Sequence, residues 1–146
     1  MLFRSWATSN LGNAIPGATP RARIDVRTPV PGFPILARTG RPAGVQVRVQ
    51  NLSTRPFPTR ASYGRRLVRL GAQLCQLDGT LINRDFARAE FHESLAGGAS
   101  ANVRFTLPPL PERGRFALKF DLVYEGVDWF ERCGSPTTVK PLWVGP

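Results

Sequence analysis

GRFALKFDLVYEGVDWFERCGS, residues 114–135, is the stretch that decides the fold. It begins with a strict alternation of side chains, which is the pattern of a half-buried β-strand. The positions predicted to face the core are Phe116, Leu118, Phe120 and Leu122, and those between them are Ala117, Lys119, Asp121 and Val123. The strand runs into a turn, residues 124–130, that combines aromatics, carboxylates and a glycine. Such a turn is more specific than a plain connection requires.

Six further segments predict short strands by the same alternation. They are residues 23–28, 44–52, 66–77, 81–86, 101–107 and 137–144. Asp78 and Gly79 form a strong hairpin signal between two of them. Pro141 predicts that the last strand lies at a sheet edge or carries a bulge. Residues 87–95 fit either a helical turn or an irregular strand, and Phe57 is predicted to fill one end of the core.

The spacing of these strands favours one architecture. About seven short strands separated by turns, without a long helical period or a βαβ rhythm, predict an all-β fold: an immunoglobulin-like antiparallel β-sandwich of about seven to eight strands. The 146 residues suffice for one domain. Residues 22–146 are expected to form it, and residues 1–21, rich in small residues and proline, to form a flexible N-terminal segment. The roles of Trp6 and Trp143 are left open.

Composition restricts the location of the protein. No segment approaches the ~18 consecutive apolar residues of a membrane span, and the first residues contain no apolar run of the kind that secretory signals require. We therefore expect a cytoplasmic protein. Cys75 and Cys133 are expected to be free thiols in a reducing compartment, with a bridge across the sandwich as the alternative.

The net charge of +10 admits two explanations. Arginines are spread singly along the chain and alternate with apolar residues, which favours solubilising charge, whereas a dedicated polyanion-binding face is the alternative. The segment with the best mixture of arginine and tyrosine for nucleic acid spans residues 60–69. Nucleic acid is disfavoured as a partner, because no OB-fold or RRM signature accompanies that segment.

Catalytic motifs are absent from the sequence. His92 is the only histidine, and neither a G-x-S-x-G, a phosphate loop nor an H-E-x-x-H is present. A metal site from Glu90, His92 and Glu93 is disfavoured because it lacks a fourth ligand. Glu125 is expected to accept hydrogen bonds from turn amides rather than to act as an acid or base. We predict a protein that is not an enzyme and needs neither metal nor cofactor.

Sugar binding by a sandwich requires a sheet face with planar polar groups and an aromatic side chain. The outward strand positions predicted to supply this chemistry are Gln46, Arg48, Gln50, Arg69, Gln73, Arg104, Lys119 and Asp121, together with Trp129 from the turn. The pattern is generic, because every solvated sheet face is polar.

One known family has similar motifs. The chain contains V-x-V-x-N-L-S at residues 47–53, L-P-P-L-P at 107–111 and, from Gly114 to Ser135, G-x-F-x-L-x-x-D-L-V-x-E-G-x-x-W-F-x-x-x-G-S. It thereby resembles the C-terminal O-antigen-binding domain of polysaccharide-exporting ABC-transporter ATPases and similar domains appended to bacterial glycosyltransferases. The specific part of the match consists of Glu125, Gly126, Trp129, Phe130 and Gly134.

The resemblance implies a non-catalytic module that binds bacterial surface polysaccharide, as in lipopolysaccharide biosynthesis and export. It also implies a possible homodimer by edge-strand exchange and a glycosyltransferase or transporter partner. The motif residues are expected to hold the fold more than to touch sugar. The alternative function is a protein-interaction module that recruits a glycan-processing enzyme.

Overall fold

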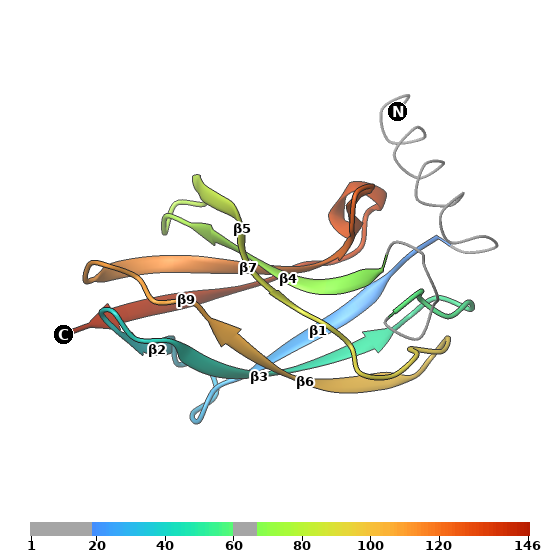
Figure 1. The fold of residues 1–146 in the computed structure, drawn as a ribbon, viewed down its shortest axis with the longest axis horizontal. Coiled ribbons are helices and arrows are strands. Elements are labelled where there is room, and N and C mark those ends of the chain that lie inside the picture. Colours follow the sequence, from blue (N-terminus) through green and yellow to red (C-terminus); the bar gives the residue numbers. More distant parts are fainter. Residues whose placement is uncertain (1–18, 60–66) are drawn as a thin grey trace.

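The chain folds into two facing β-sheets (Figure 1). The computed structural model describes residues 19–59 and 67–146. In this part of the chain the elements are β1 Ala22–Arg27, β2 Ile35–Arg38, β3 Ala43–Asn51, β4 Val68–Cys75, β5 Leu81–Ala89, β6 Ser100–Leu107, β7 Gly114–Tyr124, β8 Asp128–Trp129, the short 3-10 helix η1 Phe130–Cys133, and β9 Thr138–Gly145. All seven predicted strands are present, and the ambiguous residues 87–95 extend β5 to Ala89.

One sheet has the order β1-β3-β6, and the other has the order β2-β9-β7-β4-β5 with β8 paired to β7. This arrangement confirms the predicted immunoglobulin-like β-sandwich. The sheets are not wholly antiparallel, however, because β2 pairs with β9 in parallel. The sequence did not predict β2, which follows the proline-rich residues 29–34. β2 pairs with β9 only over residues 142–145. Pro141 lies just before these residues, so it pairs with β7 but not with β2.

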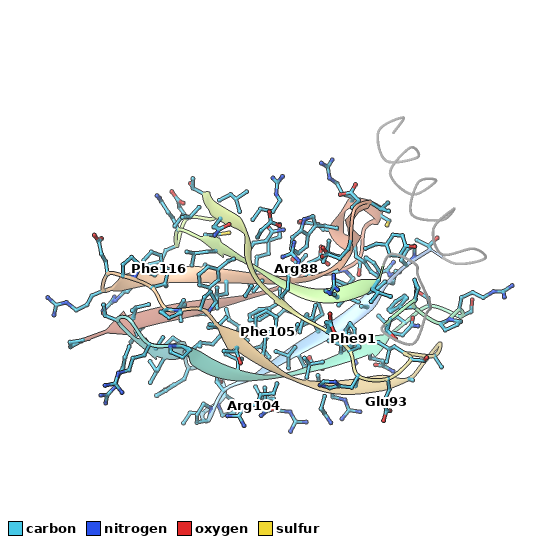
Figure 2. The ribbon with its side chains drawn as sticks, in the orientation of Figure 1. Arg88, Phe91, Glu93, Arg104, Phe105 and Phe116 are labelled. Atoms are coloured by element: carbon cyan, nitrogen blue, oxygen red, sulfur yellow. The ribbon has the colours of Figure 1, made fainter. Side chains whose placement is uncertain are left out.

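Alternating side chains fill the space between the sheets. Phe105 of β6 and Phe120 of β7 meet edge to face across the sandwich with ring centroids 5.6 Å apart. Figure 2 shows Phe105 between the sheets and its neighbour Arg104 on the outside. On β7, Leu118, Phe120 and Leu122 are fully buried, as the alternation predicted. Each such side chain contributes about 1.5–3 kcal/mol through burial.

The end of the core is closed by loops. Phe57 is buried, which confirms its predicted position, and it packs edge to face against Phe130 with ring centroids 5.2 Å apart. Phe91 and Leu95, which follow β5, are buried beside them in the same core cluster. An isolated bridge pairs Phe57 with Leu95. The residues after β5 therefore serve as a lid on the core.

The start of the domain lies slightly before its predicted boundary. The Ser53 hydroxyl donates to the Thr19 carbonyl oxygen at 3.1 Å and accepts a hydrogen bond from the Arg21 backbone N–H at 3.0 Å. The Ser135 hydroxyl accepts from the Ala22 backbone N–H at 3.0 Å. Residues 19–21 are thus attached to the sandwich. Most of the predicted flexible segment, including Trp6, lies outside the described residues.

Candidate functional site

The predicted ligand-binding residues lie on two opposite faces of the molecule. Four of them lie on the outer face of the three-stranded sheet: Gln46, Arg48 and Gln50 on β3, and Arg104 on β6, where Gln46 and Arg104 are register partners. The other five belong to the six-stranded sheet and its turn: Arg69, Gln73, Lys119, Asp121 and Trp129. Because the whole core separates the two groups, the nine residues cannot form one site. Strand alternation distinguishes inside from outside but does not assign a sheet.

A polar groove lies on the outer face of the six-stranded sheet, which we call the outer groove. Its volume is about 510 Å³. Three of the predicted residues, Gln73, Lys119 and Trp129, line it. Glu125 and Asp128 of the turn also line it, together with charged residues that the sequence did not single out: Arg84, Asp85, Arg88, Glu131 and Arg132. Arg69 lies at the margin of the groove, where it forms an ion pair with Glu125.

The motif turn builds one wall of the outer groove. Gly126 has φ 78° and Gly134 has φ 86°, a left-handed backbone that favours glycine. The Val127 N–H donates to the Tyr124 carbonyl oxygen at 2.9 Å, which returns the chain so that β8 pairs with β7. Phe130 is fully buried. The two glycines therefore shape the turn, and Phe130 attaches it to the core.

Trp129 is fixed by neighbours on the sheet. The Arg88 guanidinium lies 4.5 Å from the centroid of its ring, a cation–π distance. A β-carbon added to Gly71 of β4 would lie 2.6 Å from the Trp129 ring, so this glycine provides the space that the indole occupies. The Arg88 guanidinium thus covers one face of the ring, and the backbone of β4 at Gly71 contacts part of the ring. This arrangement favours a structural role for Trp129.

Glu125 binds arginines, whereas the sequence predicted that it would accept turn amides. Its carboxylate accepts from Arg88 Nε at 2.9 Å and lies 3.9 Å from Arg69 Nη1. Arg69 also pairs with Glu90 at 3.0 Å, and Arg88 with Asp85 at 2.6 Å. The sequence did not predict the contact with Arg88, because Arg88 lies in the segment whose structure the sequence left ambiguous. The network connects β4, β5 and the motif turn across the groove margin.

Asp121 is wholly buried, so its predicted role as a solvent-facing sugar ligand is wrong. Its two carboxylate oxygens accept from the backbone N–H groups of Leu122 and Glu131, each at 2.9 Å. Burial raises the pKa of Asp121 to about 7, although these hydrogen bonds oppose the shift. Gln73 is also almost buried, with 7% exposed. Both residues point to the outer face, but η1 and the groove side chains cover that face.

The two cysteines are buried and free. Burial raises the pKa of the Cys133 thiol to about 11, and the charges of Asp121 and Asp128 add to the effect. Burial likewise raises the pKa of Cys75. At neutral pH both thiols are therefore protonated and poor nucleophiles.

The N-L-S motif has a structural function. Asn51 is fully buried, its side-chain amide donates to the carbonyl oxygens of Arg55 and Leu95, and its Oδ1 accepts the Ser53 backbone N–H at 2.8 Å. These bonds attach β3 to the loop that follows β5. Asn51 and Ser53 of the motif therefore stabilise the fold.

Neither metal binding nor membrane insertion has support within residues 19–59 and 67–146. No group of three or more His, Cys, Asp or Glu side chains there is placed to hold a metal ion. His92 and Glu93 are exposed, while Glu90 is paired with Arg69. No helix in the same residues is long and apolar enough to cross a membrane. The predicted basic and aromatic segment lies outside the described residues from Arg60 to Arg66.

Comparison with known proteins identifies the fold only. No protein-family model matches the chain, and no curated protein matches it. Among solved structures, the CARDB domain of the PF1109 protein from Pyrococcus furiosus, in complex with di-metal ions, matches with a TM-score of 0.51 and 15% identity, over 86% of this chain and 94% of that chain. A beta-glucosidase from Listeria innocua, in complex with isofagomine, matches with a TM-score of 0.52 and 15% identity. That match covers 87% of this chain but 16% of the enzyme. The chain is thus similar in fold to a CARDB domain and to a small part of a large enzyme.

Proposed function

We propose that the chain is a non-catalytic module that binds bacterial surface polysaccharide, such as O-antigen, in the outer groove. The observation that carries the proposal is the convergence of Gln73, Lys119 and the motif turn on one open groove. The groove mixes an amide, basic groups and carboxylates, all of which exchange hydrogen bonds with hydroxyls. These groups suit the recognition of sugar hydroxyls.

The groove is preorganised by ion pairs. Lys119 Nζ lies 2.6 Å from a Glu131 carboxylate oxygen, and Arg132 lies 3.5 Å from Asp128. Paired side chains lose less freedom when a ligand orders them, which lowers the entropic cost of binding. The paired Lys119 and Glu131 side chains are 27% and 47% exposed, so their polar groups are accessible to sugar hydroxyls. These features suit a weak, multi-point contact with a polymer.

The resemblance to the O-antigen-binding domains supports the same site. The part of the chain that carries the resemblance contributes Glu125 to Trp129, Glu131 and Arg132 to the wall of the outer groove. If the wall residues stay the same among related domains and the other lining residues differ, the domains would bind different glycans with the same fold. The similarity to part of a glycosidase is compatible with a module that serves a glycan-processing enzyme or exporter, but it carries fold information alone.

The test is a titration of the folded protein with neutral and acidic bacterial polysaccharides, followed by calorimetry or a glycan array. Lys119→Met and Gln73→Leu preserve side-chain volume while they remove polar groups from the groove. We expect each to weaken binding about threefold to tenfold, the value of one or two hydrogen bonds. Arg23→Gln, which changes an exposed residue of β1, is the control and should bind like the wild type. Absence of binding at millimolar glycan by a well-folded sample refutes the proposal.

A second candidate function, an assembly module that recruits a glycan-processing enzyme, is favoured by the surface around β2. Val30, Phe33 and Leu36 there are 46%, 55% and 67% exposed, and a concavity of about 630 Å³ adjoins them. Clustered apolar side chains of this size are typical of protein contacts. This function predicts capture of the partner enzyme, or a stable dimer, without glycan. Polar substitution of Phe33 should abolish that association and leave glycan binding unchanged.

A further inference from the structure

A second concavity lies on the six-stranded sheet, at the end away from the motif turn. We call it the arginine hollow; its volume is about 820 Å³. It is formed where β2, β9 and the start of β7 lie side by side, and its charged and aromatic lining residues are Arg38, Arg41, Arg113, Arg115 and Trp143. The Arg115 guanidinium lies 4.7 Å from the centroid of the Trp143 ring, which is 42% exposed. Trp143, whose role the sequence left open, is thus a partly open aromatic surface.

The charged side chains that line the hollow are all positive. No Asp or Glu side chain of the described residues lines it. None of the salt bridges in residues 19–59 and 67–146 involves any of its four arginines. Three arginines at the outer groove, Arg69, Arg88 and Arg132, are by contrast each paired with a carboxylate. A concave surface that bears charge of one sign attracts an oppositely charged ligand.

Backbone contacts fix the loops that carry these arginines. Leu36, Trp143 and Arg115 lie abreast on β2, β9 and β7. After β2, the Thr39 N–H and hydroxyl both donate to the Gly145 carbonyl oxygen at 2.8 Å, and the Gly40 N–H donates to the Leu110 carbonyl oxygen at 2.8 Å. The turn between β2 and β3 is therefore attached to the end of β9 and to the β6–β7 connection. These hydrogen bonds hold the backbone of the loops that carry the arginines.

We propose that the arginine hollow binds the carboxylate groups of an acidic polysaccharide whose neighbouring sugars occupy the outer groove; this rests on the proposed function. A guanidinium matches the two oxygens of a carboxylate with parallel hydrogen bonds. The apolar C–H face of a sugar ring packs on an exposed indole such as Trp143. The ligand is a polymer because Arg115 and Lys119 lie on the same face of β7, four residues apart, which is about 13 Å in a strand. One extended chain therefore reaches both concavities.

The experiment compares polygalacturonate with the same polymer after full methyl esterification, which removes the charge and keeps the sugar. The variant Arg113→Gln/Arg115→Gln removes two charges from the hollow. Arg23→Gln/Arg55→Gln removes two exposed charges elsewhere and leaves the net charge of the two proteins equal. We expect the dissociation constant for polygalacturonate to rise about tenfold in the first variant, since two solvent-exposed ion pairs of up to about 1 kcal/mol each are lost. It should change less than about twofold in the second, because isolated surface charges contribute little.

Each outcome decides the proposal. Equal weakening in both variants shows a net-charge effect and overturns it. The proposal is also overturned if a DNA duplex binds with the same dependence on Arg113 and Arg115. It is likewise overturned if polygalacturonate does not bind at all. If the methyl ester binds as well as the acid, and Lys119→Met weakens both, the outer groove binds glycan and only the inference about the hollow fails. If no polysaccharide binds the folded protein, the proposed function fails as well.

Discussion

The Arg88 guanidinium stacks on the Trp129 ring, 4.5 Å from its centroid, while its Nε donates to Glu125 at 2.9 Å. One arginine of β5 thus contacts the two most distinctive residues of the motif turn. Since β5 is an edge strand, this contact attaches the edge of the sheet to the turn that follows its central strand. The motif residues are therefore best explained as parts of one structural joint at the margin of the outer groove.

Trp129→Ala should destabilise the fold more than it weakens glycan binding. The indole fills the space above Gly71, so its removal leaves a cavity and ends the contact with Arg88. We expect a loss of about 2–4 kcal/mol of unfolding free energy, measured by denaturant titration. Binding to the remaining folded protein should stay within about threefold of wild type. Loss of binding with unchanged stability would instead make Trp129 a sugar platform.

Gly71→Ala tests the same contact from the other side. A β-carbon at this position would lie 2.6 Å from the Trp129 ring, so the ring must move and its packing suffers. The expected destabilisation is about 1–3 kcal/mol. In Gly71→Ala/Trp129→Ala the clash disappears, and the double variant should be more stable than the sum of the single effects predicts by about 1 kcal/mol. Simple additivity would mean that the two residues do not contact each other in solution.

Glu125→Gln should measure how much the ion pairs of Glu125 with Arg88 and Arg69 stabilise the fold. The substitution keeps the size of the side chain but removes the charge that faces Arg88 and Arg69. We expect a destabilisation of about 1 kcal/mol at low salt that shrinks at high salt, because the pairs are partly exposed. Glu93→Gln makes the same chemical change at an exposed side chain, and thermal denaturation should barely detect it. An effect of Glu125→Gln that does not depend on salt would contradict the ionic explanation.

The sequence predicted the strands well because alternation is a local property. All seven predicted strands occur, and Leu118, Phe120 and Leu122 face the core. β2 was missed because its parallel partner, β9, is distant in the sequence and prolines precede it. Pairing of this kind depends on the whole chain and leaves little local pattern.

The candidate site was harder to predict for a related reason. Alternation showed that Gln46 and Lys119 both point outward, yet they lie on opposite faces because the assignment of strands to sheets is not local. It also placed Asp121 correctly on the outer side of β7, but it did not reveal that η1 covers this position. Trp143 and the arginines around it carried no motif. Their convergence requires the ends of three strands to meet.

Asp121 should make the stability of the protein depend on pH. Its pKa is raised from the ordinary 3.8 to about 7 in the folded state, chiefly by burial. Between these two values the folded state retains a proton that the unfolded state releases, so stability falls as pH rises from about 4 through about 7. The slope contributed by this residue approaches about 1.4 kcal/mol per pH unit. Urea denaturation at several pH values in this window measures it.

Asp121→Asn isolates that contribution. The amide does not titrate, so the stability of the variant relative to wild type should improve steadily as pH rises from about 4 to about 7 and then level off. At low pH the variant should be the less stable protein, because its single oxygen cannot accept both the Leu122 and the Glu131 N–H groups and one buried donor loses its partner. Parallel stability curves for the two proteins would show that the Asp121 carboxyl titrates alike in the folded and unfolded states, and hence that η1 does not shield it from water.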